Sequence, residues 1–139
     1  MKAMPKRFKD EYMSLPYMCD IAAASEASGI DWKSLSGKNV LVAGAGGIIG
    51  SAVVDAVMSS CSTASVYAIS TSRGIEYARN RFFAYADDER FHIIEADLSE
   101  KKSMDALVSV GVRFDIVISA AGRPRPDLYE TIPVGTLLS

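Results

Sequence analysis

The chain has 139 residues, of which 49% are hydrophobic and 23% are charged, and its formal net charge is −2. These values are typical of a globular sequence of about one domain, and the near-neutral charge gives no reason to expect nucleic acid or an anionic membrane as a partner. No apolar run in the sequence approaches the roughly 20 residues that span a bilayer. The two cysteines have no CxxC spacing, which favours a reduced, cytoplasmic compartment.

The first 36 residues lack the regular alternation of the rest of the chain. We expect residues 1–36 to be an N-terminal appendage and residues 37–139 to form a separate domain. Within the appendage, residues 20–28 are predicted to form a short helix, with Asp20 as its N-cap and Gly29 as its C-terminal stop. Trp32, just before the first expected strand, is predicted to pack on the bottom of the sheet.

Strand and helix patterns alternate from residue 38 onward. The helix patterns cover residues 47–60 and 73–86 and a segment from Met104 to about Gly111; the strand patterns cover residues 39–43, 65–70, 91–95 and 114–119. The first helix carries apolar residues at helical spacing, namely Ile48, Ile49, Val53, Val54, Val57 and Met58. A strand–helix series of this kind requires parallel strands with right-handed crossovers. The prediction is an α/β fold: a Rossmann-type, doubly wound parallel sheet, truncated after about four strands.

A glycine-rich turn follows the first expected strand. The apolar run at residues 40–43 leads into Gly44, Gly47 and Gly50, and a helix begins there. The first amides of a helix have no partner within the helix and lie at the positive end of its dipole, so such a turn can hold a pyrophosphate. A glycine loop alone is a weak signal, and glycines used only for tight packing are the alternative.

A second loop is expected opposite the glycine turn. In the usual doubly wound order, the first strand lies between the second and the fourth, and a crevice opens between the ends of strands one and four. The loop after strand four consists of small residues, Ser119, Ala120, Ala121 and Gly122. Small residues leave room for a ligand across the sheet edge.

Taken together, these motifs resemble a known family. The spacing Gly44-x-x-Gly47-x-x-Gly50, the Asp97-Leu98 pair after strand three and the small-residue loop at 119–122 are similar to the extended short-chain dehydrogenase/reductase family, specifically the NAD-dependent epimerase/dehydratase branch that acts on nucleotide sugars. The resemblance runs from about residue 32 to the end. Residues 125–137 resemble a stretch that leads into the next long helix in members of bacterial surface-polysaccharide biosynthesis.

The resemblance implies that residues 37–139 are a partial NAD(P)-binding Rossmann domain, and it implies a set of cofactor-binding residues. The glycine loop would hold the cofactor pyrophosphate, with Asp97 and Leu98 beside the adenine and the loop after strand four near the nicotinamide-side ribose. For Asp97 the alternative is an acid that stabilises a turn or a helix start. The full predicted set is Gly44, Gly46, Gly47, Ile48, Ile49, Gly50, Arg73, Asp97, Leu98, Ala120, Ala121 and Gly122.

The choice between NAD and NADP depends on the residues after strand two. An acid there would bind the ribose diol, whereas an arginine would suit a 2′-phosphate. The sequence reads Ser70-Thr71-Ser72-Arg73, with no acid. Arg73 favours NADP slightly and NAD stays nearly equal, so the expected cofactor is NAD or NADP.

The sequence contains no predicted catalytic residue. The resemblance implies a tyrosine activated by a lysine four residues later, and no Tyr-x-x-x-Lys occurs in these 139 residues. Tyr77 with Arg81 has the nearest spacing, but we expect it to serve packing, away from the crevice. The single histidine, His92, is expected to pack within strand three, and no cluster has the spacing of metal ligands.

These observations lead to a ranked set of functions. The first is the NAD(P)-binding N-terminal part of a nucleotide-sugar epimerase/dehydratase-like oxidoreductase, inactive alone and meeting a nucleotide sugar only in a longer protein. The alternative is a non-catalytic dinucleotide-binding sensor or regulatory module, and the third is a structural remnant without a ligand. A homo-oligomer is expected, formed through the open edge of the strand at 114–119 or through the tail after Gly122.

Overall fold

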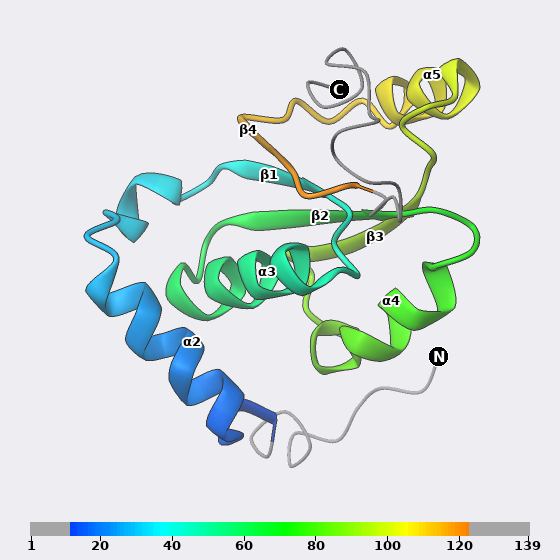
Figure 1. Cartoon of the computed structure of the whole chain (residues 1–139). Helices are drawn as coiled ribbons and strands as arrows, with labels where there is room; N and C mark the ends of the chain where they lie inside the picture. The colour runs from blue at the N-terminus through cyan, green and yellow to red at the C-terminus, as the bar shows by residue number, and fades with distance from the viewer. Residues whose placement is uncertain (1–11, 123–139) are drawn as a thin grey trace, which may run out of the picture.

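The computed structural model describes residues 12–122, and it contains a four-stranded parallel sheet with the strand order β3-β2-β1-β4 (Figure 1). The strands are β1 (Asn39–Ala43), β2 (Ser65–Ser70), β3 (Phe91–Glu95) and β4 (Ile116–Ser119). The helices are α2 (Pro16–Ala27), η1 (Trp32–Leu35), α3 (Ile48–Ser60), α4 (Ile75–Arg81), η2 (Phe83–Tyr85) and α5 (Lys101–Ser109). This arrangement confirms the predicted Rossmann-type α/β fold.

The core lies on both sides of β1, because successive side chains of a strand point to opposite faces of the sheet. Val40 and Val42 pack with α3 and α4, whereas Leu41 packs with Leu107 of α5. Accordingly, α3 and α4 lie on one side of the sheet and α5 on the other (Figure 1). Covering both faces explains why β1 has no polar alternation.

The strands match their predicted ranges, except that β4 begins at Ile116 instead of residue 114. Phe114 lies before the strand, where its ring meets that of Tyr67 edge to face, with ring centroids 5.3 Å apart. As expected, β4 is an edge strand: Ile116 and Ile118 pack toward the α3 side, and Val117 is 64% exposed on the other face.

The second helix is shorter than predicted. The range 73–86 was expected to be one helix, but α4 ends at Arg81 and a separate 3-10 turn, η2, follows. Phe82 has φ −100° and ψ 22°, outside the helical region, and its side chain is 1% exposed. The break allows the rings of Phe82 and Tyr85 to pack together on Phe91.

The N-terminal helix starts earlier than predicted. Asp20 is not its N-cap; α2 starts at Pro16 with Leu15 in the N-cap position, because proline suits the first turn of a helix. Gly29, just beyond the helix, has φ +71° as a stop residue would. The Trp32 ring packs against the core cluster on the α3 side of the sheet, and its indole nitrogen donates to the carbonyl of Ser25 over 3.0 Å.

Other expectations are tested only in part. His92 lies within β3 as expected, and although it is exposed, its ring stacks on Tyr67 with centroids 4.5 Å apart. The stretch at 125–137 lies outside the described residues, so its resemblance is untested. No helix within residues 12–122 is long and apolar enough to cross a bilayer.

Candidate functional site

A crevice opens at the carboxyl ends of the strands, where β1 and β4 lie side by side. It encloses about 780 Å³, within the usual size of a small-ligand site. Its walls come from the loops after all four strands: Gly44, Gly46, Gly47, Ile69, Ser70, Thr71, Gly74, Tyr77, Ala96, Asp97, Leu98, Ser99, Ala120, Ala121 and Gly122.

Close backbone contacts shape the floor of this crevice. Gly44 has φ +69°, and a Cβ there would lie 2.6 Å from the amide nitrogen of Ala121. A Cβ on Gly50 would collide with the carbonyl oxygen of Gly44. Glycine is therefore required at both positions, at Gly44 so that the two loops meet and at Gly50 so that α3 can begin directly beneath the turn.

The start of α3 has the features of an anion site. Gly47 occupies the N-cap position, and within residues 12–122 no side-chain hydrogen bond caps the helix there. The hydroxyl of Ser51 donates to the carbonyl of Ile48, over 3.2 Å. An uncapped helix N-terminus, a tight glycine turn and a cavity of this size fit the pyrophosphate of a dinucleotide.

The structure brings eight of the twelve predicted site residues to the crevice wall: Gly44, Gly46, Gly47, Asp97, Leu98, Ala120, Ala121 and Gly122. The other four do not line it. Gly50 lies beneath the turn, and Arg73 is exposed in the turn before α4. Ile48 and Ile49 are 92% and 71% exposed, so they also fall outside the buried stripe of α3.

Asp97 stabilises the turn after β3, which is the alternative considered for it. Its Oδ1 accepts hydrogen bonds from the backbone nitrogen of Ser99 over 2.9 Å and from the Ser99 hydroxyl over 2.5 Å. The same residue lines the crevice. The turn that Asp97 stabilises therefore forms part of the crevice wall.

Sequence reasoning missed one wall of the crevice. Ser70 and Thr71 at the end of β2, together with Gly74 and Tyr77, form its α4 side. The expectation that Tyr77 lies away from the crevice is wrong: its ring atom Cδ1 is 3.5 Å from where a Cβ of Gly46 would lie. No local pattern in the sequence indicated this wall, because the path of α4 past the glycine loop is set by tertiary packing.

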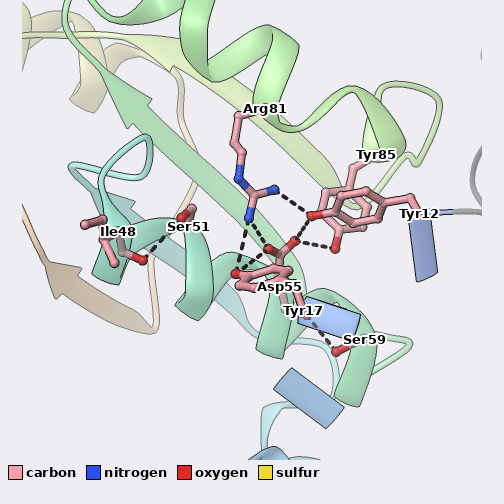
Figure 2. Close-up of polar contacts among 8 residues, drawn as sticks. All are labelled: Tyr12, Tyr17, Ile48, Ser51, Asp55, Ser59, Arg81 and Tyr85. Atoms are coloured by element: carbon pink, nitrogen blue, oxygen red, sulfur yellow. Dashed lines mark hydrogen bonds and ion pairs between the residues drawn. The ribbon is translucent and has the colours of Figure 1, made fainter. Parts of the chain in front are cut away.

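A buried polar cluster adjoins this wall (Figure 2). Asp55 of α3 is 0% exposed, and Arg81 donates to its Oδ2 over 2.5 Å. Hydroxyls of three tyrosines also donate to this carboxylate: Tyr12 and Tyr17 over 3.0 Å each and Tyr85 over 2.6 Å. A buried carboxylate needs such partners, since losing water without replacement costs several kcal/mol, on the order of the whole stability of a domain.

The cluster changes the acidity of its tyrosines. Burial, reinforced by the charge of Asp55, raises the pKa of Tyr12 to about 12. The same two causes raise the pKa of Tyr17, and burial followed by the hydrogen bond to Asp55 raises that of Tyr85. All three therefore remain protonated donors at neutral pH.

A second hollow of about 670 Å³ lies between the glycine loop and the N-terminal segment, of which Tyr12, Leu15 and Tyr17 line it. It shares Gly46, Gly47 and Tyr77 with the crevice, so these three residues form the boundary of both. Its remaining wall residues are Ile48, Ser51, Asn80 and Arg81. No group of three or more His, Cys, Asp or Glu residues within 12–122 is arranged to hold a metal ion.

The fold and the crevice define a Rossmann-type nucleotide-binding protein. The model of the NAD dependent epimerase/dehydratase family matches residues 40–138, and the chain belongs to that family. No curated protein matches the sequence.

Several solved structures share the fold of this chain. The NADPH-bound carbonyl reductase from chicken fatty liver has a TM-score of 0.60 and 20% identity, over 75% of this chain and 41% of that one. A metagenomic short-chain oxidoreductase in complex with NADP has a TM-score of 0.58 and 23% identity, over 74% and 48%. An NADP-bound 3-oxoacyl (acyl-carrier-protein) reductase from Agrobacterium tumefaciens C58 has a TM-score of 0.57 and 18% identity, over 79% and 43%.

This chain thus spans less than half the length of each of these three proteins. The expected cofactor, NAD or NADP, agrees with the family description and with the NADP(H) named for all three neighbours.

Proposed function

We propose that this chain is the NAD(P)-binding N-terminal part of a nucleotide-sugar epimerase/dehydratase-like oxidoreductase of polysaccharide biosynthesis, and that it works in the cytoplasm. The observation that carries the proposal is the crevice, with the uncapped start of α3 beneath a glycine turn that touches the loop after β4. Residues 37–139 would form the cofactor domain. When bound, the dinucleotide would supply hydride transfer, while this chain's own residues bind and orient it.

Different crevice residues would bind different parts of the dinucleotide. First-turn amides of α3 would hold the pyrophosphate, with Gly46 and Gly47 leaving it room. Asp97 and Leu98 would flank the adenosine half, and the small residues at 120–122 the other ribose. Because the sequence has no Tyr-x-x-x-Lys, we do not expect these 139 residues to catalyse hydride transfer on their own.

Calorimetric titration of the full chain with NAD⁺, NADH, NADP⁺ and NADPH tests the proposal. We expect saturable binding with one site per chain for at least one of the four. Absence of binding to all of them at millimolar concentration, with an unchanged melting temperature, would instead favour a structural remnant without a ligand.

One substitution tests the location of the site. In Gly46→Asp a carboxylate enters the crevice where the nearest side-chain atoms are 3.5 Å or more from the new Cβ, so the chain should fold. The added charge faces the pyrophosphate and should weaken binding at least tenfold, roughly 1.4 kcal/mol. Ser62→Asp, an exposed turn residue beyond the opposite end of α3, is the matched control and should bind as the native chain does.

A second function that the same crevice would serve is that of a non-catalytic dinucleotide sensor that regulates a partner. Both functions use the same crevice. Incubating the chain with cell extract distinguishes the two functions. A sensor captures one defined protein only when the cofactor is bound, whereas the cofactor domain of an enzyme captures none in this way.

We further propose that the chain forms a homo-oligomer through the edge of β4. That edge is unpaired within residues 12–122, and Val117 is 64% exposed on it. Unpaired apolar edges bind other strands. Light scattering at high concentration should show a dimer or larger species, Val117→Lys should shift it toward the monomer, and a native chain that stays monomeric would refute the proposal.

A further inference from the structure

The Asp55 cluster joins parts of the chain that are far apart in sequence. Its donors come from Tyr12 before α2, from Tyr17 in the first turn of α2, from the last residue of α4 and from η2, and all reach one carboxylate of α3. Figure 2 shows the hydroxyls of Tyr12, Tyr17 and Tyr85 converging on Asp55 together with the Arg81 guanidinium. A single buried ion pair thus ties the N-terminal segment to two helices of the Rossmann fold.

Arg81 is the centre of this connection. Its guanidinium also donates to the hydroxyls of Tyr12, over 2.5 Å, and Tyr17, over 3.2 Å. The guanidinium carbon lies 5.9 Å from the ring centroid of Tyr12 and 5.4 Å from that of Tyr17, within range of a cation–π attraction. The two tyrosines therefore hold Arg81 by hydrogen bonds and by their ring faces.

Anchoring Arg81 also fixes the crevice wall. Tyr77 precedes Arg81 by four residues on α4, so both lie on the same side of a helix only seven residues long. Tyr77 is 62% exposed, yet its ring rests against the glycine loop at Gly46. Little burial holds this ring in place, so its position depends on how α4 is held.

We propose that Tyr12 and Tyr17 are positioning residues of the cofactor site: through Asp55 and Arg81 they hold α4 so that Tyr77 stands against the glycine loop beside the bound dinucleotide. The N-terminal segment thereby sets cofactor affinity, although residues 12–38, as far as the structure describes the segment, supply no wall of the crevice. Tyr12, Tyr17 and Tyr77 all line the second hollow, so the tyrosines that hold Arg81 and the ring that they position border the same space. The inference rests on the proposed dinucleotide binding.

A thermodynamic cycle on the full chain tests this coupling. The double variant Tyr12→Phe/Tyr17→Phe removes two hydroxyls and keeps both rings, and it should weaken NADPH or NADH binding about fivefold. In a Tyr77→Ala background the same two changes should weaken binding less than twofold, because the ring that they position is gone. A purely structural role would lower affinity equally in both backgrounds, and that result would overturn the proposal.

Two measurements keep the outcome interpretable. Thermal unfolding without ligand sets a temperature at which every variant is folded, and titration to millimolar cofactor keeps the weakest variant measurable. Tyr67→Phe is the matched control: Tyr67 lines neither hollow, and its ring meets His92 and Phe114 instead. Its affinity should match the native chain's. If the native chain binds no dinucleotide, the proposed function fails; if it binds and the double variant binds equally well, only this inference fails.

Discussion

The two sides of the glycine loop are built in different ways. On the crevice side, backbone contacts of Gly44 and Gly50 determine the shape, and any larger residue would collide. On the side facing the N-terminal segment, the arrangement is determined by the buried carboxylate of Asp55 and its four side-chain donors. The first side combines a seven-residue turn with a close backbone contact from Gly44 to the loop after β4, while the second joins side chains 26 to 43 residues apart. Gly44 and Gly50 leave no room for a larger residue, whereas the cluster depends on the charge of Asp55.

Removing the carboxylate should have the largest effect on stability. Asp55→Ala leaves the Arg81 guanidinium, whose side chain is 19% exposed, and three tyrosine hydroxyls without their acceptor. We expect the free energy of unfolding to fall by about 3–5 kcal/mol, measured by urea denaturation. Asp55→Asn retains one acceptor oxygen and the same shape, and it should lose less. Equal stability of the alanine variant and the native chain would show that the cluster does not hold the N-terminal segment.

A larger residue in the glycine turn should have the next effect. In Gly50→Ala the new methyl group meets the Gly44 carbonyl, so the start of α3 must shift. We expect a loss of about 1–3 kcal/mol and dinucleotide binding at least tenfold weaker, measured by denaturation and calorimetry. Gly46→Ala, whose methyl would make only ordinary contacts at 3.5 Å or more, should be close to native in stability. A well-folded Gly50→Ala chain with native affinity would contradict a backbone-determined crevice.

This contrast explains which features could be predicted from the sequence. The glycine turn and the small loop at 119–122 are each a short run of consecutive residues, so each can be recognised in the sequence. The usual strand order then places the two loops beside each other at the ends of β1 and β4. The end of α4 at Arg81 was not predicted, because the apolar residues keep helical spacing through Phe82. The Phe82 ring is buried in the core against Phe91. Asp55 lies among apolar residues on α3, and its partners are set by tertiary packing that no local pattern shows. Tyr77 was misplaced for the same reason, since the path of α4 decides which way it faces.

Raising the pH should weaken the cluster without any substitution, and with the smallest effect of the three. The pKa of Tyr12 is about 12 in the folded chain and about 10 when exposed. Folding therefore favours the protonated form of Tyr12, so the contribution of its hydroxyl to the free energy of unfolding is complete below pH 10 and is lost as the pH rises to 12.

Tyr12→Phe has no hydroxyl proton to lose, so comparing its unfolding with that of the native chain isolates the contribution of the Tyr12 hydroxyl. The difference in stability between the native chain and Tyr12→Phe should shrink between pH 10 and 12; two curves that stay parallel would show that the Tyr12 hydroxyl does not bind Asp55. Because Tyr12 is half-buried and solvent screens part of the charge, we expect this change to be smaller than that in Gly50→Ala.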